Sequence, residues 1–334
     1  GLDFKPDCVS LARLSDSGDN RVHFTSVRGP NKYVYLNTNG TEGTRAWGDG
    51  WSISSFNEGG FSIGSWNNIN LNDKEYCAWC WKGGGQPSIL HPYMIDGVGY
   101  INSSSASLDG GTITPSRASI NTKAGFGMYE YTGESATKTI SHGLGKEPKW
   151  IFAKRMTGSA QNWLMYHGYY GGHKGWNMNT NTQMYDDSGY WADTNPTSSL
   201  ITIGNYHTGS PYMMYAFAEI EGYSKFGSYM GTGNSDWAPF IYCGFKPAMI
   251  ICKDIETGNE NWGLVDDTRS KHNPRTRTQY WSNQGGEQDH SVNTMDFYSN
   301  GFRLRTSDSR WNHDARRYIF MAFARSPFTV SNAE

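Results

Sequence analysis

The sequence predicts an all-β protein built from three related units. Of its 334 residues 40 are glycine, and aromatic residues make up 15%, which is typical of short strands joined by tight turns. Runs of Ala, Leu, Glu and Lys at helical spacing are absent, so a helical bundle is not expected. Strand-like segments recur about every 8–12 residues between Gly, Asn and Asp turns, which favours sandwiches or barrels. We therefore expect tandem β-sandwich units of the jelly-roll or lectin-like kind.

Each unit opens at a proline and closes on a tyrosine-led apolar strand. The prolines are Pro6, Pro148 and Pro247. The closing segments are residues 76–81 (YCAWCW), 212–217 (YMMYAF) and 318–323 (YIFMAF). The spans from proline to last aromatic are nearly equal, which indicates one structural unit used three times. Repeated units more often display surfaces than house one catalytic site, so we expect a binding or structural protein.

The repeat divides the chain into four segments. Residues 1–82 form the first β-sandwich unit, and residues 83–124, which open with three glycines, read as a linker with one hairpin. Residues 125–222 and 223–334 form the second and third units, each led by a hairpin expected to pair with the first strand of its unit. The first unit lacks this lead-in. We therefore expect the C-terminal part of a longer polypeptide, with residues 329–334 as its natural end.

Several side chains recur at equivalent positions and are expected to be structural. The matched pairs are Trp163 with Trp262, Trp51 with Trp191, and Arg28 with Arg269. A tryptophan that recurs in a repeat is expected to anchor a core, because buried rings dominate core energetics.

Composition and charge exclude several classes of protein. The net charge is −2, from 29 basic and 31 acidic residues without a basic stripe, so nucleic acid is not an expected partner. No apolar run is long enough for membrane insertion. Five cysteines, an odd number, do not indicate a disulfide framework. Cys77 and Cys80 occupy apolar slots of the repeat, so we expect core packing rather than a metal centre.

No catalytic residues or cofactors are expected, because no nucleophile or metalloprotease motif is present. Seven histidines, mostly in predicted loops, are expected at the surface or in turns: His142, His167, His173, His207, His272, His290 and His313. The adjacent acids Asp186-Asp187 and Asp266-Asp267 are expected in solvated turns or caps. Asp16 and Asp19, with Asn20, are candidate oxygen ligands for calcium, although the later units lack these acids.

Carbohydrate contact is the strongest binding hypothesis. Sugar recognition uses flat aromatic faces beside Asn, Asp or His hydrogen bonds. The loop before each closing strand has this makeup: Trp66, Asn67 and Asn68; Tyr206 and His207; Trp311, Asn312 and His313. We expect these residues to be displayed at loop tips. The alternative is that the rings fill contacts between neighbouring units or subunits.

Four segments carry a family likeness. They are residues 219–229 (EIEGYSKFGSY), 242–247 (YCGFKP), 300–305 (NGFRLR) and 321–328 (MAFARSPF). In this combination and order the chain resembles a repeated domain of unknown function in virion proteins of tailed bacteriophages, notably marine phages. The likeness covers nearly the whole chain apart from about residues 85–120.

The resemblance implies a structural protein of the virion, tail- or fibre-associated, with no known catalytic residues. It implies an extracellular particle assembled in the host cytoplasm and other virion proteins as partners. From the repeats we also expect a homo-oligomer, and from the aromatic loops a non-enzymatic protein that contacts host-surface glycans. One alternative is a capsid-decorating or head-fibre protein that clamps shell subunits. Another is a polysaccharide-degrading tailspike, which needs two converging carboxylates that nothing in the sequence marks out.

Overall fold

The computed structural model describes residues 2–16, 18–44, 51–289 and 294–325. Within these ranges the chain is almost entirely β-structure, which confirms the predicted all-β class. The helices there are single turns: α1 (Asn67–Asn70), α2 (Ser188–Trp191) and α3 (Ser309–Asn312). In the described part of the chain, no helix has the length and apolar character that a bilayer-spanning segment needs. The expected chain end, residues 329–334, lies outside the described residues.

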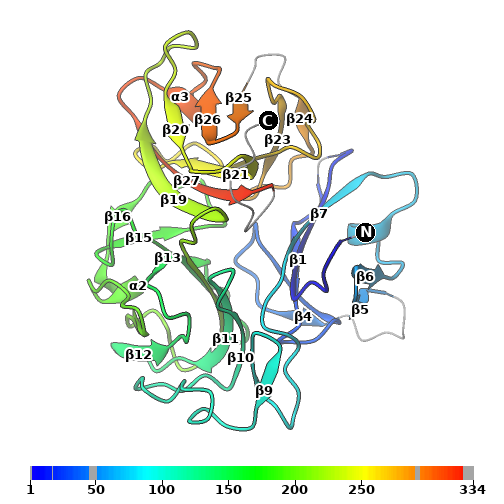
Figure 1. The fold of residues 1–334 in the computed structure, drawn as a ribbon, viewed down its shortest axis with the longest axis vertical. Coiled ribbons are helices and arrows are strands. Elements are labelled where there is room, and N and C mark those ends of the chain that lie inside the picture. Colours follow the sequence, from blue (N-terminus) through cyan, green and yellow to red (C-terminus); the bar gives the residue numbers. More distant parts are fainter. Residues whose placement is uncertain (1, 17, 45–50, 290–293, 326–334) are drawn as a thin grey trace.

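Lobe 1, drawn in blue beside the N-terminus in Figure 1, holds a five-stranded and a two-stranded sheet. The large sheet has the order β4 (Gly43–Thr44), β3 (Lys32–Tyr35), β2 (Val22–Thr25), β1 (Cys8–Arg13) and β7 (Tyr76–Trp81). The small sheet pairs β5 (Ile53–Asn57) with β6 (Gly60–Ile63). Helix α1 lies between β6 and β7 in the chain.

Lobe 2 holds a nine-stranded sheet and a two-stranded sheet. The large sheet has the order β16 (Tyr185–Asp186), β15 (Lys174–Asn177), β14 (Leu164–His167), β13 (Pro148–Arg155), β18 (Pro211–Ala218), β11 (Phe126–Thr132), β10 (Arg117–Asn121), β8 (Tyr93–Ile95) and β9 (Val98–Tyr100). The small sheet pairs β12 (Lys138–Ser141) with β17 (Leu200–Ile203), and α2 precedes β17.

Lobe 3 holds a six-stranded sheet and a three-stranded sheet. The large sheet has the order β19 (Ser224–Met230), β27 (Arg317–Ala324), β21 (Pro247–Asp254), β22 (Gly263–Asp266), β23 (Arg277–Tyr280) and β24 (Gln288–Asp289). The small sheet has the order β20 (Phe240–Tyr242), β26 (Gly301–Leu304) and β25 (Met295–Tyr298). Helix α3 precedes β27.

The strand order of the three large sheets corresponds. Starting from the closing strand, the orders are β7-β1-β2-β3-β4, β18-β13-β14-β15-β16 and β27-β21-β22-β23-β24. Pro148 and Pro247 begin β13 and β21, and each stands at a register shift against its closing strand. Proline has no N–H to donate, so strand starts and bulges tolerate it. Pro6 lies just before β1.

The lead-in segments do not pair as predicted. β11 and β19 lie along the closing strands β18 and β27, not beside the first strands β13 and β21. The next strands, β12 and β20, belong to the small sheets, so neither lead-in is a hairpin. The closing strands of lobes 2 and 3 are therefore hydrogen-bonded to a neighbouring strand along each edge. This position explains their unbroken apolar sequences.

Residues 83–124 are part of the lobe 2 sheet rather than a flexible linker. They supply the predicted hairpin, β8–β9, and also β10, which pairs with β8 and β11. Gly83 and Gly84 are buried. A Cβ atom at Gly84 would lie 2.2 Å from the carbonyl oxygen of Ile120 and 2.4 Å from that of Met94. Only glycine fits this close approach of backbones.

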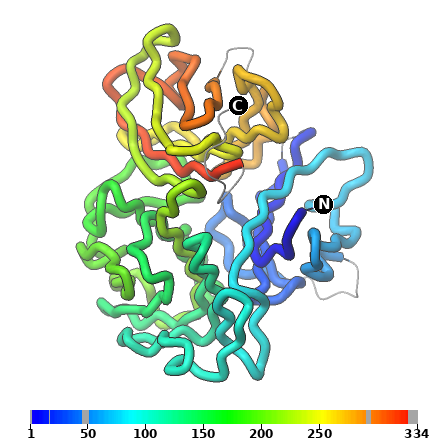
Figure 2. Tube along the Cα trace, viewed as in Figure 1, coloured from blue at the N-terminus to red at the C-terminus, as the bar shows by residue number. Residues whose placement is uncertain are grey.

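One aromatic core is shared by all three lobes. It takes Cys8, Trp150 and Met249 from the first strands and Trp79, Tyr215 and Met321 from the closing strands. The alternate residues of these strands face three outer cores, one between the large and small sheets of each lobe. Because side chains alternate across a strand, both faces of each large sheet are buried. Figure 2 shows the three lobes around this common centre.

The recurring tryptophans occupy different positions relative to these cores. Trp163 and Trp262, expected to be core anchors, are both buried in the central core. Trp191 is buried in the outer core of lobe 2, whereas its matched residue Trp51 is 48% exposed. The match between Trp51 and Trp191 is therefore one of sequence and not of burial.

Neighbouring lobes meet through the same backbone hydrogen bond three times. In each, the acceptor is the carbonyl of the residue that follows a first strand. The N–H groups of Glu42, Met184 and Glu287 donate to the carbonyls of Met156, Ile255 and Leu14, at 2.9, 3.0 and 2.9 Å. These bonds join lobe 1 to lobe 2, lobe 2 to lobe 3, and lobe 3 to lobe 1. The lobes therefore close into a ring around the central core.

Side chains at these joints also correspond. Trp163 Nε1–H donates to the carbonyl of Tyr35, the last residue of β3, at 2.9 Å. At another joint Arg21 Nε–H donates to the carbonyl of Tyr280, the last residue of β23, at 3.2 Å. Arg21 precedes β2 as Trp163 precedes β14, so different side chains make the same bond.

Candidate functional site

Four buried histidines are neutral inside the fold. Burial lowers the pKa of His23 and His207 to about 3, and the pKa of His142 and His167 to about 4. The expectation that His142, His167 and His207 lie at the surface is therefore wrong, and His290 lies outside the described residues. His207 Nδ1 lies 2.6 Å from the hydroxyl of Tyr131. These rings are hydrogen-bonding parts of the core rather than proton carriers near neutral pH.

Acid is expected to destabilise the protein below about pH 6.5. The folded pKa of each buried histidine lies below its unfolded value, so the unfolded state binds more protons as the pH falls from about 6.5 towards about 4. At pH 5 each such histidine should lower the free energy of unfolding by about 2 kcal/mol. Urea unfolding at pH 7 and pH 5 measures this loss. The loss between pH 7 and pH 5 should be smaller in a His207→Gln variant. It should be unchanged in a His91→Gln variant, which alters an exposed histidine. An equal loss in the unaltered protein and both variants would contradict this account.

The two cysteines of β7 do not form a metal-binding pair. Cys77 packs against the central core and Cys80 against the outer core of lobe 1, on opposite faces of the strand. Burial raises the pKa of both thiols to about 12. Both are therefore protonated near neutral pH, whereas metal binding and nucleophilic attack need the thiolate.

The carboxylates that are adjacent in the sequence make structural contacts within the fold. Asp186 forms a surface ion pair with Lys174, and Asp187 caps α2. Asp266, expected in a solvated turn, is instead buried and binds Arg269, with 2.6 Å between carboxylate oxygen and Nε. None of these four acids lines the pocket formed around residues 83–85.

The candidate calcium ligands are engaged with cations. Asp16 lies 2.7 Å from the ammonium group of Lys74, and Asp19 lies 2.7 Å from the guanidinium group of Arg13. Across the described ranges, no three His, Cys, Asp or Glu side chains gather as a metal site requires. Calcium binding at this turn stays a prediction.

Most residues predicted to bind glycans are buried. The buried ones are Trp66, His207, Trp311 and Asn312. For these four the prediction of display at loop tips is wrong, because the turns around α1 and α3 place Trp66 and Trp311 in outer cores. Asn67 and Tyr206 are exposed, and Asn68 and His313 are half-buried. These four residues come from three lobes, and no contact brings them into one site.

Exposed aromatic side chains gather instead on the small sheet of lobe 3. Phe240 and Tyr242 are alternate residues of β20 and both point outward, with exposed fractions of 46% and 65%. Tyr242 and Tyr298 are the cross-strand partners of Gly301, and the Phe240 ring lies over this glycine. Trp237, 80% exposed, precedes β20. We call Trp237, Phe240, Tyr242 and Tyr298 the aromatic face.

Polar groups border the aromatic face. The ring centres of Phe240 and Tyr298 lie 5.9 Å apart. Asp296 Oδ2 accepts a hydrogen bond from the Tyr298 hydroxyl at 3.1 Å and lies 3.5 Å from Arg305 Nε. Its Oδ1 atom is buried and has no hydrogen-bond partner among the described residues. Exposed rings of this kind, two of them bearing hydroxyl groups, suit a ligand rich in hydroxyl groups.

Fold and surface together define an all-β protein with a shared aromatic centre and one exposed aromatic face. Residues 1–327 match the model of a protein family described as a domain of unknown function, DUF7483. The chain belongs to this family. No curated protein and no solved structure matches the chain significantly.

Proposed function

We propose that this protein is a non-enzymatic structural protein that contacts glycans through its aromatic face. The observation that carries this proposal is the outward placement of Phe240, Tyr242 and Tyr298 on one sheet, with Asp296 beside them. The rings offer flat surfaces to the C–H faces of a sugar, and the hydroxyl groups of the exposed Tyr242 and Tyr298 offer hydrogen bonds to its hydroxyls. The backbone of a paired strand holds the rings in place, so little conformational entropy is lost on binding.

The arrangement of sheets supports the structural part of the proposal. In this proposal the lobes are three copies of one β-sandwich unit, each a large sheet packed on its own small sheet. The matching joints tie the copies into a closed ring. A ring with one shared core resists bending at its joints, which suits a part of a large assembly.

The segments at residues 219–229 and 321–328 support a place in a tailed-phage virion, as a tail or fibre component beside other virion proteins and further copies of itself. Mass spectrometry of purified particles, followed by immunogold labelling, tests this placement. We expect the protein in the particle and the label on the tail. Label confined to the capsid would favour the shell-clamping alternative, and absence from purified particles would remove the virion part of the proposal. Neither result bears on glycan contact.

Removing rings from the aromatic face should abolish glycan contact. On a glycan array, the unaltered protein is expected to bind a subset of bacterial surface saccharides. A Trp237→Ala/Tyr242→Ala variant should bind them at least about tenfold more weakly, because a stacked ring contributes about 1 kcal/mol or more. The matched control is Tyr169→Ala, at a tyrosine of lobe 2 that is 57% exposed.

Two outcomes would overturn the glycan proposal: a blank array for the unaltered protein, or an equal loss in the control variant. Release of free oligosaccharide from host polysaccharide would overturn the non-enzymatic part and favour the tailspike alternative.

A further inference from the structure

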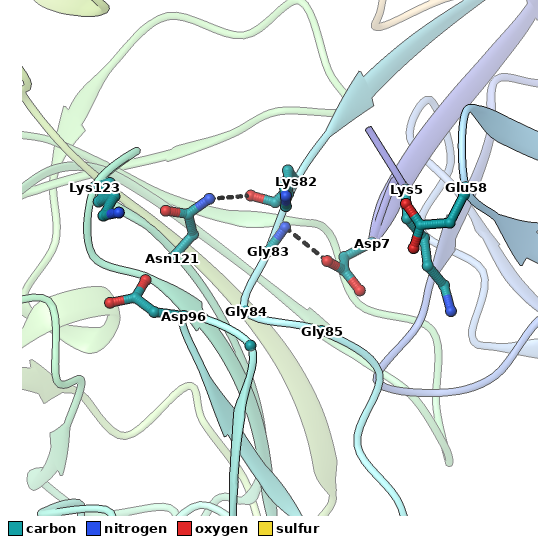
Figure 3. Close-up of a pocket in the computed structure, with 11 residues that line it drawn as sticks. Lys5, Asp7, Glu58, Lys82, Gly83, Gly84, Gly85, Asp96, Asn121 and Lys123 are labelled. Carbon is teal, nitrogen blue, oxygen red and sulfur yellow. Dashed lines mark hydrogen bonds between the residues drawn. The ribbon is translucent and has the colours of Figure 1, made fainter. Parts of the chain in front are cut away.

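A recess lies where lobe 1 meets the β8–β10 part of lobe 2 (Figure 3). Its volume is about 410 Å³, within the roughly 300–1,000 Å³ typical of small-molecule pockets. Lobe 1 contributes Lys5, Asp7 and Lys82 to its lining, and the other side contributes Asp96 and Lys123. This recess shares no residue with the aromatic face.

The floor of the recess is rigid. The backbone of Gly83, Gly84 and Gly85 forms it, and Gly84 is held between the carbonyl groups of Ile120 and Met94. The buried carboxylate of Asp7 accepts hydrogen bonds from the Ser26 hydroxyl at 2.7 Å and from the Gly83 N–H at 2.9 Å. The pocket is therefore formed before any ligand arrives, so binding does not have to order it.

The lysines of the recess are free while most of its carboxylates are engaged. Among the described residues, none of Lys5, Lys82 and Lys123 forms an ion pair. Asp96 accepts hydrogen bonds from the Thr122 N–H at 2.8 Å and from its hydroxyl at 2.5 Å. Burial raises the pKa of Asp7 above its ordinary value. Glu58, at the rim, is exposed to solvent. The formal charges of the lining balance, three lysines against three carboxylates, but the unused hydrogen-bonding capacity is that of ammonium donors.

We infer that this recess binds a small molecule bearing an oxyanion group, a phosphate, sulfate or carboxylate, on a body of about one sugar ring. Ammonium groups make their strongest hydrogen bonds to such oxyanions. The volume exceeds what a bare oxyanion fills and leaves space for an attached ring. Asn121 lines the same wall; its Nδ2 donates to the Lys82 carbonyl at 3.1 Å and its Oδ1 accepts from the Ala124 N–H at 3.0 Å, which leaves its second N–H for a ring hydroxyl.

Isothermal titration calorimetry with four probes tests this inference: inorganic phosphate, glucose 6-phosphate, glucuronate and glucose. We expect at least one of the two anionic sugars to bind about tenfold or more tightly than glucose. Tighter binding of glucose 6-phosphate assigns the oxyanion as phosphate, and tighter binding of glucuronate assigns it as carboxylate. Absence of binding by all three anions, or glucose binding as tightly as both anionic sugars, would overturn the inference.

The lysines are tested with a Lys82→Gln/Lys123→Gln variant, which should bind the preferred anion at least about tenfold more weakly. Lys271→Gln, at an exposed lysine of lobe 3, is the matched control and should bind as the unaltered protein does. Thermal unfolding of both variants checks that the fold is retained. Undiminished binding by the double variant, or equal weakening by the control, would refute the role of these lysines.

Discussion

Replacing Trp150 with alanine is expected to destabilise the entire protein and not one lobe alone. Trp150 is buried in the central core, with its ring centre 5.0 Å from that of Phe217 in its own sheet and 6.4 Å from that of Trp281 in lobe 3. Truncating a large buried ring leaves a cavity that neighbouring rings fill only in part. We expect a loss of about 3–5 kcal/mol in the free energy of unfolding.

Urea unfolding followed by circular dichroism and by tryptophan fluorescence measures this loss. Because all lobes share the core, both probes should report one transition, shifted to lower urea. Trp237→Ala, at an exposed tryptophan, is the matched control and should change stability by less than about 0.5 kcal/mol. Two separate transitions, with lobe 1 unfolding as before, would show that the central core does not couple the lobes.

Replacing Arg28 with methionine should have an effect of similar size. The buried Arg28 guanidinium lies 2.7 Å from the Glu42 carboxylate, with side-chain exposures of 2% and 14%. Removing one partner of a buried ion pair costs about 3–5 kcal/mol, because Glu42 then keeps only its 3.4 Å contact with the more exposed Lys32. Lys32→Met removes the more exposed partner of Glu42 and should cost about 1 kcal/mol or less. Comparable losses in the two variants would show that the buried bond is not the stabilising one.

Lobe 2 suggests how the lost stability can be recovered. In lobe 3 the corresponding pair is Arg269 with Glu287, 2.9 Å apart, but lobe 2 has Tyr170 and Met184 packed against the central core. An Arg28→Tyr/Glu42→Met variant transplants the pair of lobe 2 into lobe 1. We expect this double variant to unfold at higher urea than the Arg28→Met variant, because it also removes the Glu42 carboxylate that has lost its buried partner. A double variant less stable than Arg28→Met would show that the two positions are not equivalent.

The closing strands were predictable because their sequences reflect their burial. Residues 76–81, 212–217 and 318–323 are apolar at nearly every position, and the structure places a core on each side of each closing strand. The tryptophans that precede β14 and β22 were predictable as core anchors for the same reason. Arg21 was not, because an arginine in a tryptophan slot gives no sequence signal until its bond to Tyr280 is seen.

Local composition gave wrong predictions where contacts between distant parts of the chain determine the structure. Three consecutive glycines are typical of a flexible linker, yet here Gly84 is required by the approach of two strands more distant in the chain. Trp66 and Trp311 stand among polar residues, as displayed rings do, but α1 and α3 bring them inward. The pairing of β11 and β19 with closing strands was likewise invisible from the spacing of the repeat.

The repeat pattern in the sequence could not predict the two candidate binding surfaces. Residues of the aromatic face are peculiar to lobe 3, so a comparison that seeks recurring positions passes over them, although the outward alternation of Phe240 and Tyr242 was readable. The recess draws Lys5, Lys82 and Lys123 from three separate stretches of the chain. The pairing of β1 with β7 brings Lys5 and Lys82 to one side of the recess, and the meeting of two lobes adds Lys123.

The closed ring also affects how many copies of a binding surface one molecule presents. A symmetric homotrimer must present every surface in triplicate, so any substitution appears three times. Here one covalent chain supplies all three positions, and the joints already use unlike side chains such as Trp163 and Arg21 for the same bond. Each lobe is consequently free to diverge by itself. In the proposed role, such a molecule would offer a single glycan-binding face per ring, and avidity would come from the number of copies in the proposed assembly.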